Sequence, residues 1–314
     1  MNVLLTGTTG FVGSALALTI RSMPSLRLTV ATRAPQSNPQ PVQHHVVGDL
    51  SATTDWSSAV TGQEVVIHAA ARAHVLAETT ADPMATFRSM NVDGTISLAR
   101  QAAAAGVKRF IFISSIGVNG AETKVKPFTA DDVGAPHSDH ALSKHEAEIG
   151  LQALARETDL EIVVIRPSLV YGPNAPGNFG MLVRWVTRGL PLPLGAVTTN
   201  RRSLVGLENL VDLILTCIDH PNAANQTFLV SDGDDLSTSD LLRRIGKALN
   251  RPARLLPIPA SVMNAVLNAL GKKSIAQNLL GSLQVDISKT RTLLGWTPPL
   301  SVDDGLRRAV AQRP

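Results

Sequence analysis

The sequence predicts an α/β protein with a doubly wound parallel sheet and a smaller C-terminal lobe. In the first half of the chain, short β-branched runs alternate strictly with helical patterns. The segments EVVIHAA (64–70) and RFIFISS (109–115) are almost wholly apolar, as is typical of strands buried on both faces. After Pro167 the chain becomes rich in Gly and Pro, which indicates long loops and a second structural unit.

The individual elements follow from periodicity. Period-two or continuous apolar runs predict strands at 3–6, 28–32, 46–47, 65–69, 110–114 and 162–166. Apolar residues at helical spacing predict helices at 12–22, 85–105 and 140–158. We therefore expect a cofactor-binding domain at 1–170, to which 203–222 returns, and a substrate-binding lobe formed by 171–202 and 223–314.

Composition excludes several classes of protein. The chain has 314 residues and a net charge of +4, but its basic residues are scattered, so we expect no nucleic-acid partner. It has no apolar run of about 18 residues that could span a bilayer. The segment 261–273 has an apolar stripe that ends in two lysines, and we favour a core-facing helix over contact with a membrane surface. We expect a cytoplasmic protein without a metal site.

The segment TGTTGFVG places three glycines between the first strand and the first helix. Glycines permit a tight turn and close backbone approach, and the helix N-terminus offers free N–H groups to a pyrophosphate. We therefore predict a Rossmann-type dinucleotide site. The cofactor-binding residues predicted in this loop are Gly7, Thr9, Gly10, Phe11, Val12 and Gly13.

The end of the second strand bears on the choice of dinucleotide. NAD-binding sheets usually carry an acid there, whereas an arginine accommodates the 2′-phosphate of NADP. This chain has Arg33 and no acid, which favours NADP(H) over NAD(H). After the third strand, Asp49 is followed by Leu50. The Asp49 carboxylate is suited either to the adenine amino group or to capping a helix at 51–53, and the sequence leaves both open.

Several motifs occur in an order typical of one family. They are TGTTGFVG, GDL, HAAARAH, NVDGT, FISSIGVNG, SKHEAE, RPSLVYGP and LGWTPPLSVDDGL. Over essentially its whole length the chain resembles the extended short-chain dehydrogenase/reductases. Within them it resembles the branch of UDP-sugar 4-epimerases and UDP-4-keto-6-deoxy-N-acetylhexosamine 4-reductases.

The resemblance implies a catalytic serine, tyrosine and lysine. The serine corresponds to Ser115 and the lysine to Lys144, which in such enzymes holds the nicotinamide ribose. The tyrosine position corresponds to residue 140, where this chain has His140. The chain's one tyrosine, Tyr171, belongs to a motif after the sixth strand and cannot substitute for it.

The resemblance also implies further cofactor contacts. Ala69, Ala70 and Ala71 resemble the small-residue wall beside the pyrophosphate and ribose. Asn91 resembles the asparagine that steadies the catalytic helix. Pro167 and Ser168 resemble the segment that lies against the nicotinamide amide.

A third set of residues resembles sugar-nucleotide contacts in the lobe. The predicted substrate-binding residues are His74, Ser115, Asn178, Phe179, Leu192, Arg202 and Ser282. One departure stands out, because the family's arginine–glycine–acid cluster before VDISK (285–289) is absent. The segment NLLGSLQVD replaces it, and Ser282 is named as the substitute contact.

His140 is expected to impair catalysis. Lys144, one helical turn away, disfavours a protonated imidazole because like charges repel. The imidazole also ends roughly 2 Å short of a phenol oxygen, and a misplacement of about 1 Å can cost on the order of a hundredfold in rate.

Arg33 favours an NADPH-dependent reductase over an epimerase. The resemblance of FISSIGVNG and LGWTPPLSVDDGL to the bacterial surface-polysaccharide branch implies a UDP-linked 4-keto-6-deoxy-N-acetylhexosamine as its substrate, and we expect the reduction to be impaired by His140. The alternatives are a UDP-hexose or UDP-N-acetylhexosamine 4-epimerase and a catalytically silent NADP-binding protein. By resemblance we also expect a homodimer formed through the helices at 85–105 and 140–158.

Overall fold

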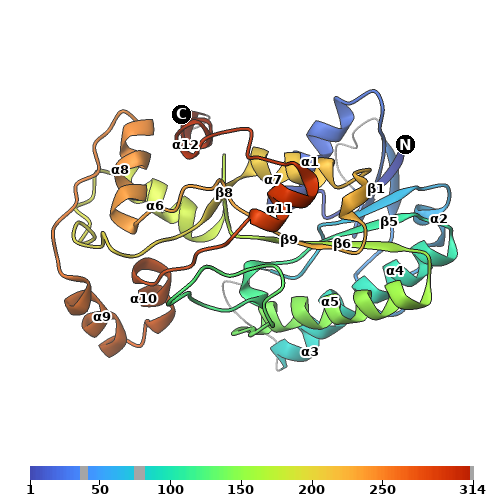
Figure 1. Ribbon diagram of the computed structural model, residues 1–314, viewed down its shortest axis with the longest axis horizontal. Coiled ribbons are helices and arrows are strands. Elements are labelled where there is room, and N and C mark those ends of the chain that lie inside the picture. The colour runs from blue at the N-terminus through green and yellow to red at the C-terminus, as the bar shows by residue number, and fades with distance from the viewer. Residues whose placement is uncertain (36–41, 74–81, 312–314) are drawn as a thin grey trace.

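The computed structural model describes residues 1–35, 42–73 and 82–311. A parallel sheet of seven strands has the order β3-β2-β1-β4-β5-β6-β9 (Figure 1). Its strands are β1 (Asn2–Thr6), β2 (Arg27–Thr32), β3 (Gln43–Val46), β4 (Val65–His68), β5 (Arg109–Ile113), β6 (Glu161–Pro167) and β9 (Thr227–Val230). The strand order reverses between β1 and β4, the point at which such sheets bind ligands. The predicted fold class is confirmed.

Alternating side chains place the sheet between two helical layers. Val3 and Leu5 of β1 join one apolar core, and Leu4 between them joins the other. The first core includes α1 (Phe11–Arg21) and α7 (Leu207–Thr216). The second includes α2 (Ser57–Val60), α4 (Gly94–Ala104) and α5 (Asp139–Glu157), on the opposite face of the sheet in Figure 1.

The predicted helix at 85–105 contains a change of winding. It begins with α3 (Pro83–Phe87), passes through the π-helical segment η1 (Arg88–Asp93) and continues as α4. The side chain of Asp82 caps its start by accepting a hydrogen bond from the amide of Ala85 at 3.0 Å. A wider π turn rotates the side chains that follow it, and here it contains the buried Asn91.

The C-terminal lobe has its own apolar core. The core is formed mainly by α6 (Gly177–Thr187), α8 (Thr238–Ala248), α12 (Val302–Ala311) and the parallel pair β7 (Leu169–Tyr171) and β8 (Leu204–Gly206). Two further helices, α9 (Ala260–Ala269) and α10 (Lys273–Leu280), lie at its end (Figure 1). The short helices η2 (Ile116–Val118) and η3 (Pro221–Ala223) and the helix α11 (Ser288–Leu294) complete the described elements.

Three expectations about the elements need correction. Strand β9 pairs with β6 in the main sheet, although residues 223–314 were expected to belong to the lobe. The third strand covers Gln43–Val46 rather than 46–47. The helix at 261–273 was expected to face the core, but no residue of α9 is buried. The division into two domains stays a prediction.

Among the described residues, no helix combines the length and apolar character needed to cross a membrane.

Candidate active site

A cleft of about 690 Å³ opens at the carboxyl ends of the first four strands of the sheet. Nine of the residues predicted to bind a cofactor line it: Gly7, Thr9, Gly10, Arg33, Asp49, Leu50, Ala69, Ala70 and Ala71. The cleft lies at the reversal of strand order between β1 and β4. Its position is therefore the one that a doubly wound sheet offers to a dinucleotide.

The glycine loop is held tightly against its neighbours. Gly7 has a φ of +77°, and a Cβ there would stand 2.6 Å from the backbone of Ala69 and Ala70. A Cβ on Gly13 would stand 2.1 Å from the carbonyl oxygen of Gly7. These close approaches bring the N-terminus of α1 against the end of β1, so its free N–H groups face the cleft. Phe11, Val12 and Gly13 lie on α1 behind this loop.

Two buried hydroxyl groups support the fit of a dinucleotide. The Oγ1 atom of Thr8 and the Oγ atom of Ser168 find no hydrogen-bond partner among the described residues. Buried polar groups rarely stay unpaired, so each is suited to a ligand. Thr8 lies in the glycine loop, and Ser168, which was expected to meet the nicotinamide amide, follows β6. Pro167 is the last residue of β6.

At the adenosine end of the cleft, Arg33 faces an acid. The Nε atom of Arg33 lies 3.7 Å from a carboxylate oxygen of Asp49, and both side chains are about three-quarters exposed. The Asp49 carboxylate thus faces the guanidinium, and α2 begins only at Ser57. Arg33 therefore does not stand alone as a ligand for a 2′-phosphate. Asp49 does not cap a helix at 51–53.

Lys144 is buried on the inner side of α5. Its Nζ atom donates a hydrogen bond of 2.8 Å to the carbonyl of Ile113 and lies 4.3 Å from the ring centre of Phe112. Burial lowers the pKa of Lys144 to about 7, although the carboxylate of Glu148 acts in the opposite direction. The ammonium group is therefore close to losing its proton at neutral pH.

Ser115 precedes η2 at the end of β5, and His140 lies one helical turn before Lys144 on α5. Ser115 caps η2, and its Oγ atom accepts a hydrogen bond of 3.1 Å from the amide of Gly117. His140 lies in the first turn of α5, half-buried, with its ring 6.3 Å from that of Phe87 in an edge-on arrangement. The helix begins where the side chain of Ser138 accepts a hydrogen bond from the amide of Ala141.

Tyr171 is unavailable to this site. It is buried in the core of the lobe, and its hydroxyl donates a hydrogen bond of 2.7 Å to Asp232. Burial raises the pKa of this phenol far above its usual range, and Asp232 adds to the effect. The expectation that it does not replace a tyrosine at 140 agrees with this position.

Asn91 connects three elements around the site. Its side-chain amide donates hydrogen bonds to the hydroxyl of Ser143 on α5 and to the carbonyl of Arg72, at 3.0 and 3.1 Å. Its carbonyl oxygen accepts a bond of 2.7 Å from the amide of Arg72. The side chain thus ties α5 to the segment after β4 rather than projecting into the cleft.

A buried ion pair fixes α5 against the sheet. Arg166 on β6 donates three hydrogen bonds to Glu148 on α5 and one of 3.0 Å to Asn119. Ser114 donates to the same carboxylate. Its neighbour Ser115 contacts Gly117 instead, so the two serines point in different directions, as expected.

Of the predicted substrate-binding residues, Arg202 and Ser282 lie close together in the structure. The side chain of Arg202 donates a hydrogen bond of 3.1 Å to the carbonyl of Gly281, beside Ser282. Burial lowers the pKa of Arg202. The Oγ atom of Ser282 accepts a bond of 3.0 Å from the amide of Arg201, and its carbonyl accepts one from Thr123. The loop that follows Ser115 therefore reaches the segment around Ser282.

The remaining substrate residues lie in the lobe or outside the described chain. Asn178 is exposed in the first turn of α6, and Leu192 is buried in a bridge with Leu255. The ring of Phe179 packs against Tyr171 inside the lobe and is not available for contact with a base, contrary to expectation. His74 lies outside the described residues.

Comparison with known proteins identifies the family to which the chain belongs. The model for the NAD dependent epimerase/dehydratase family matches residues 3–231. The chain belongs to this family. It is 47% identical over 308 residues to a Vibrio cholerae protein named UDP-glucose 4-epimerase, and the match covers 98% of this chain and 94% of the relative.

Two more distant proteins extend the comparison. An Escherichia coli N-acetyl-α-D-glucosaminyl-diphospho-ditrans,octacis-undecaprenol 4-epimerase is 26% identical over 98% of this chain and 94% of its own length. The structure of a Bacillus cereus UDP-glucuronic acid 4-epimerase in complex with NAD matches with a TM-score of 0.79 at 20% identity. That match covers 98% of this chain and 94% of the other. At that identity the likeness bears on the fold alone.

The Vibrio cholerae relative corrects the expected function. The expectation of a 4-keto-sugar reductase is wrong, because the relative that is 47% identical is named as an epimerase. The inference depended on Arg33 as a phosphate-binding arginine, but in the structure the guanidinium already has the carboxylate of Asp49 beside it.

Several residues around the site were missed from sequence. Thr8, Trp56 and Met90 line the cleft. A Cβ on Gly117 would stand 3.4 Å from the Oγ atom of Ser115 and 3.8 Å from the His137 ring, which places a second imidazole at this site. Thr8 could have been found from its place in the glycine loop. Trp56, Met90 and His137 reach the site only through tertiary packing.

Proposed function

We propose that the chain is a UDP-sugar 4-epimerase that uses NAD(H). The observation that carries the proposal is 47% identity, over nearly the whole chain, to a relative named UDP-glucose 4-epimerase. The geometry supports it through a cleft with a glycine loop, and through a buried lysine and a serine at the carboxyl end of β5 in the same sheet.

Inversion at C4 requires a hydride to leave and return, together with the proton of the C4 hydroxyl. Bound NAD would accept and return the hydride. The N-terminus of α1, with Gly7, Gly10 and Thr8, would hold the diphosphate. Ala69 and Ala71 would pack beside it, and Ser168 would meet the nicotinamide amide. On binding, the Lys144 ammonium would turn from Ile113 toward the nicotinamide ribose.

Transfer of the proton from the C4 hydroxyl is the step that this site supports least well. We propose that His140 occupies the place of the family's tyrosine, with Ser115 positioned to orient the same hydroxyl. The imidazole is shorter than a phenol, so a water molecule has to bridge the gap. The consequence is a slow enzyme whose rate rises when the longer acid is restored.

We propose NAD rather than NADP because of Asp49. Its carboxylate lies 3.7 Å from the guanidinium of Arg33 and would repel a nearby 2′-phosphate. Heat-denatured protein would release its dinucleotide for identification by mass. Weaker binding of NADP than of NAD by the wild type, with the preference reversed in Asp49→Ala, would support this assignment.

The test of the function is conversion of UDP-glucose into UDP-galactose, and of the N-acetylated pair, followed by NMR. We expect the C4 epimer to form without net production of NADH, and His140→Tyr to speed the conversion about a hundredfold. Lys144→Met is the control, because it removes the cation beside the nicotinamide and should abolish turnover in both backgrounds.

A second candidate is 4-epimerisation of an N-acetylhexosamine carried on a polyprenyl diphosphate, the type of substrate for which the Escherichia coli relative is named. Two features of the lobe favour it. The arginine–glycine–acid cluster expected to contact a nucleotide is absent, and α9 beside that segment has no buried residue. Comparing the conversion of UDP-N-acetylglucosamine and of the lipid-linked sugar in detergent would separate the two candidates.

The expected homodimer remains a proposal. The helices expected to form it, α4 and α5, pack against each other on one face of the sheet (Figure 1). Ile149 on α5 is 54% exposed, so Ile149→Asp followed by light scattering would test whether this face joins two chains.

A further inference from the structure

Helix α9 presents an apolar stripe to solvent. Val262, Val266 and Leu270 follow one another at intervals of four residues, so they share one side of the helix. Their exposed fractions are 50%, 52% and 63%. An apolar stripe of this kind normally faces a core, and here it does not.

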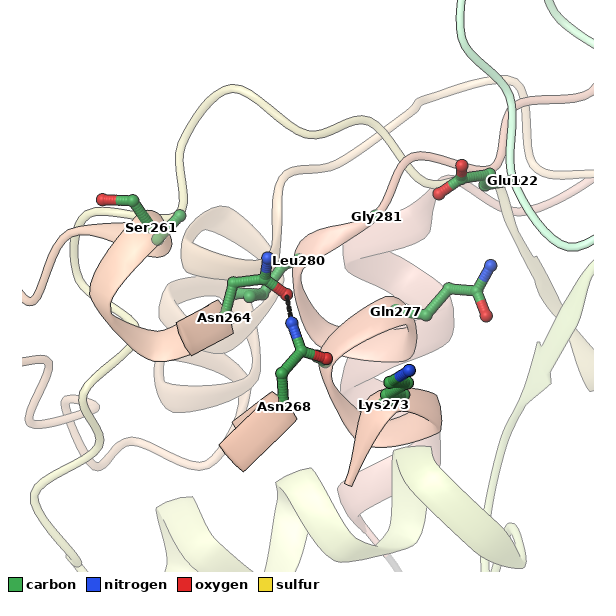
Figure 2. Close-up of a pocket in the computed structure, with 10 residues that line it drawn as sticks. Glu122, Ser261, Asn264, Asn268, Lys273, Gln277, Leu280 and Gly281 are labelled. Carbon is green, nitrogen blue, oxygen red and sulfur yellow. Dashed lines mark hydrogen bonds between the residues drawn. The ribbon is translucent and has the colours of Figure 1, made fainter. Parts of the chain in front are cut away.

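Two other sides of α9 face the core of the lobe and a cavity. Ala260 and Met263 pack against the core of the lobe. Asn264 and Asn268 line a cavity of about 500 Å³ shared with Lys273 and Gln277 of α10 (Figure 2). Glu122 faces the same cavity from the loop after β5. The stripe is therefore a third side, turned away from both.

The exposure is concentrated in this part of the chain. Among the described residues, twelve large apolar side chains are exposed, and five of them lie between 256 and 275. They are Leu256, Val262, Val266, Leu270 and Ile275. Together with Lys272 and Lys273 we call them the α9 surface. In Figure 1 the helix lies at the end of the lobe, on the opposite side of the molecule from β1.

The charge around the α9 surface is one-sided. Residues 251–285 contain Arg251, Arg254, Lys272 and Lys273 and no Asp or Glu, although the whole chain has 25 acids. Both lysines are exposed directly after α9. Glu122 lines the cavity on another side of α9 and not the stripe, and Lys273 reaches the rim of the same cavity. An apolar stripe flanked by cations complements an anionic lipid surface.

We propose that the α9 surface docks the protein onto an anionic phospholipid bilayer, with Val262, Val266 and Leu270 entering the headgroup region. A second copy of this chain is a poorer occupant, because two identical surfaces would bring their four lysines together. The proposal goes beyond the proposed function and does not depend on it, since docking requires no substrate.

The experiment is co-sedimentation of the full chain with vesicles of phosphatidylcholine, alone or mixed with phosphatidylglycerol. We expect binding to the mixed vesicles, weaker binding in high salt, and little binding to phosphatidylcholine alone. The pair Val262→Asp and Val266→Asp should weaken binding at least about tenfold, as should Lys272→Glu with Lys273→Glu. Thermal unfolding and sugar conversion should stay unchanged in the valine variant.

Leu18→Asp is the matched control, because Leu18 is 66% exposed on α1, an element of the other domain. It should bind vesicles as the wild type does. Failure of the wild type to bind mixed vesicles would overturn the proposal, as would binding that the valine pair leaves intact. If instead the valine pair turns a dimer into a monomer in light scattering and vesicles play no part, a second copy covers the stripe.

Discussion

The sheet domain and the α9–α10 end of the lobe differ in how they use their side chains. Strands β4 and β5 are buried along their whole length. His68 on β4 lies between the hydroxyls of Thr6 and Thr95, at 2.8 and 3.0 Å. On α9, in contrast, no residue is buried. Close packing is thus concentrated around the proposed cofactor site, and exposed apolar surface at the proposed docking site.

The two regions also treat charge differently. The pair Glu148–Arg166 is almost fully buried beside the catalytic helix, whereas Arg243 and Asp240 on α8 form an exposed pair. A buried charge without its partner is costly, but an exposed one is solvated by water. Removing one partner from each pair therefore measures how much more the buried pair contributes to stability than the exposed pair.

The largest effect is expected from the buried pair. Arg166→Leu leaves the Glu148 carboxylate without its partner and should lower the free energy of unfolding by about 3 kcal/mol or more. Arg243→Leu, the exposed counterpart, should change it by no more than about 1 kcal/mol. Urea unfolding of both variants provides the comparison, and equal losses would show that the buried network does not stabilise the domain.

The second largest effect is expected from a substitution in the glycine loop. Gly7→Ala introduces a Cβ 2.6 Å from the backbone of Ala69 and should weaken NAD binding at least about a hundredfold, on the order of 3 kcal/mol. Gly62→Ala is its control, because Gly62 has a similar φ of +71° but no atom within 4 Å of the added Cβ. Calorimetric titration with NAD would distinguish the two, and equal affinities would remove the loop from the cofactor site.

Lys144 gives a pH dependence with a definite sign. Its pKa is about 7 in the fold and 10.5 in the reference state, so between these values the unfolded chain binds more protons. Stability should therefore rise with pH, by about 2 kcal/mol between pH 7 and 9 relative to Lys144→Met. The measurement is urea unfolding of both proteins across this range. A parallel pH profile for the two would mean that the buried amine does not titrate as assigned.

The smallest effect compares equal truncations in the two regions. Val164→Ala in β6 removes buried methyl groups and should cost about 2 kcal/mol, while Val266→Ala on α9 should stay within about 0.5 kcal/mol. Thermal unfolding of the two variants is sufficient. If Val266→Ala were equally costly, α9 would be packed against something in solution.

Much of the sheet domain could be predicted from sequence because its signals are local. Alternating strands and helices, the glycine loop and the burial of β4 and β5 follow from residues within one element. Strand β9 escaped prediction because its four residues gain their place only by pairing with β6, about sixty residues earlier. The stripe on α9 was recognised, but periodicity cannot say what a stripe faces.

The same limit applies to the candidate site. Ser115, Lys144 and Asn91 come from motifs, yet the carboxylate beside Arg33 depends on how the ends of β2 and β3 approach each other. That contact lay beyond the sequence, and without it the arginine suggested NADP and a reductase.

The decisive property of the chain is what it does to C4 of a UDP-sugar. Purified protein and its His140→Tyr variant, each supplied with UDP-glucose and NAD, should both form UDP-galactose without accumulating NADH, the variant about a hundredfold faster. Absence of the epimer with both proteins, on the glucose and the N-acetylglucosamine substrates alike, would contradict the assignment as a UDP-sugar epimerase.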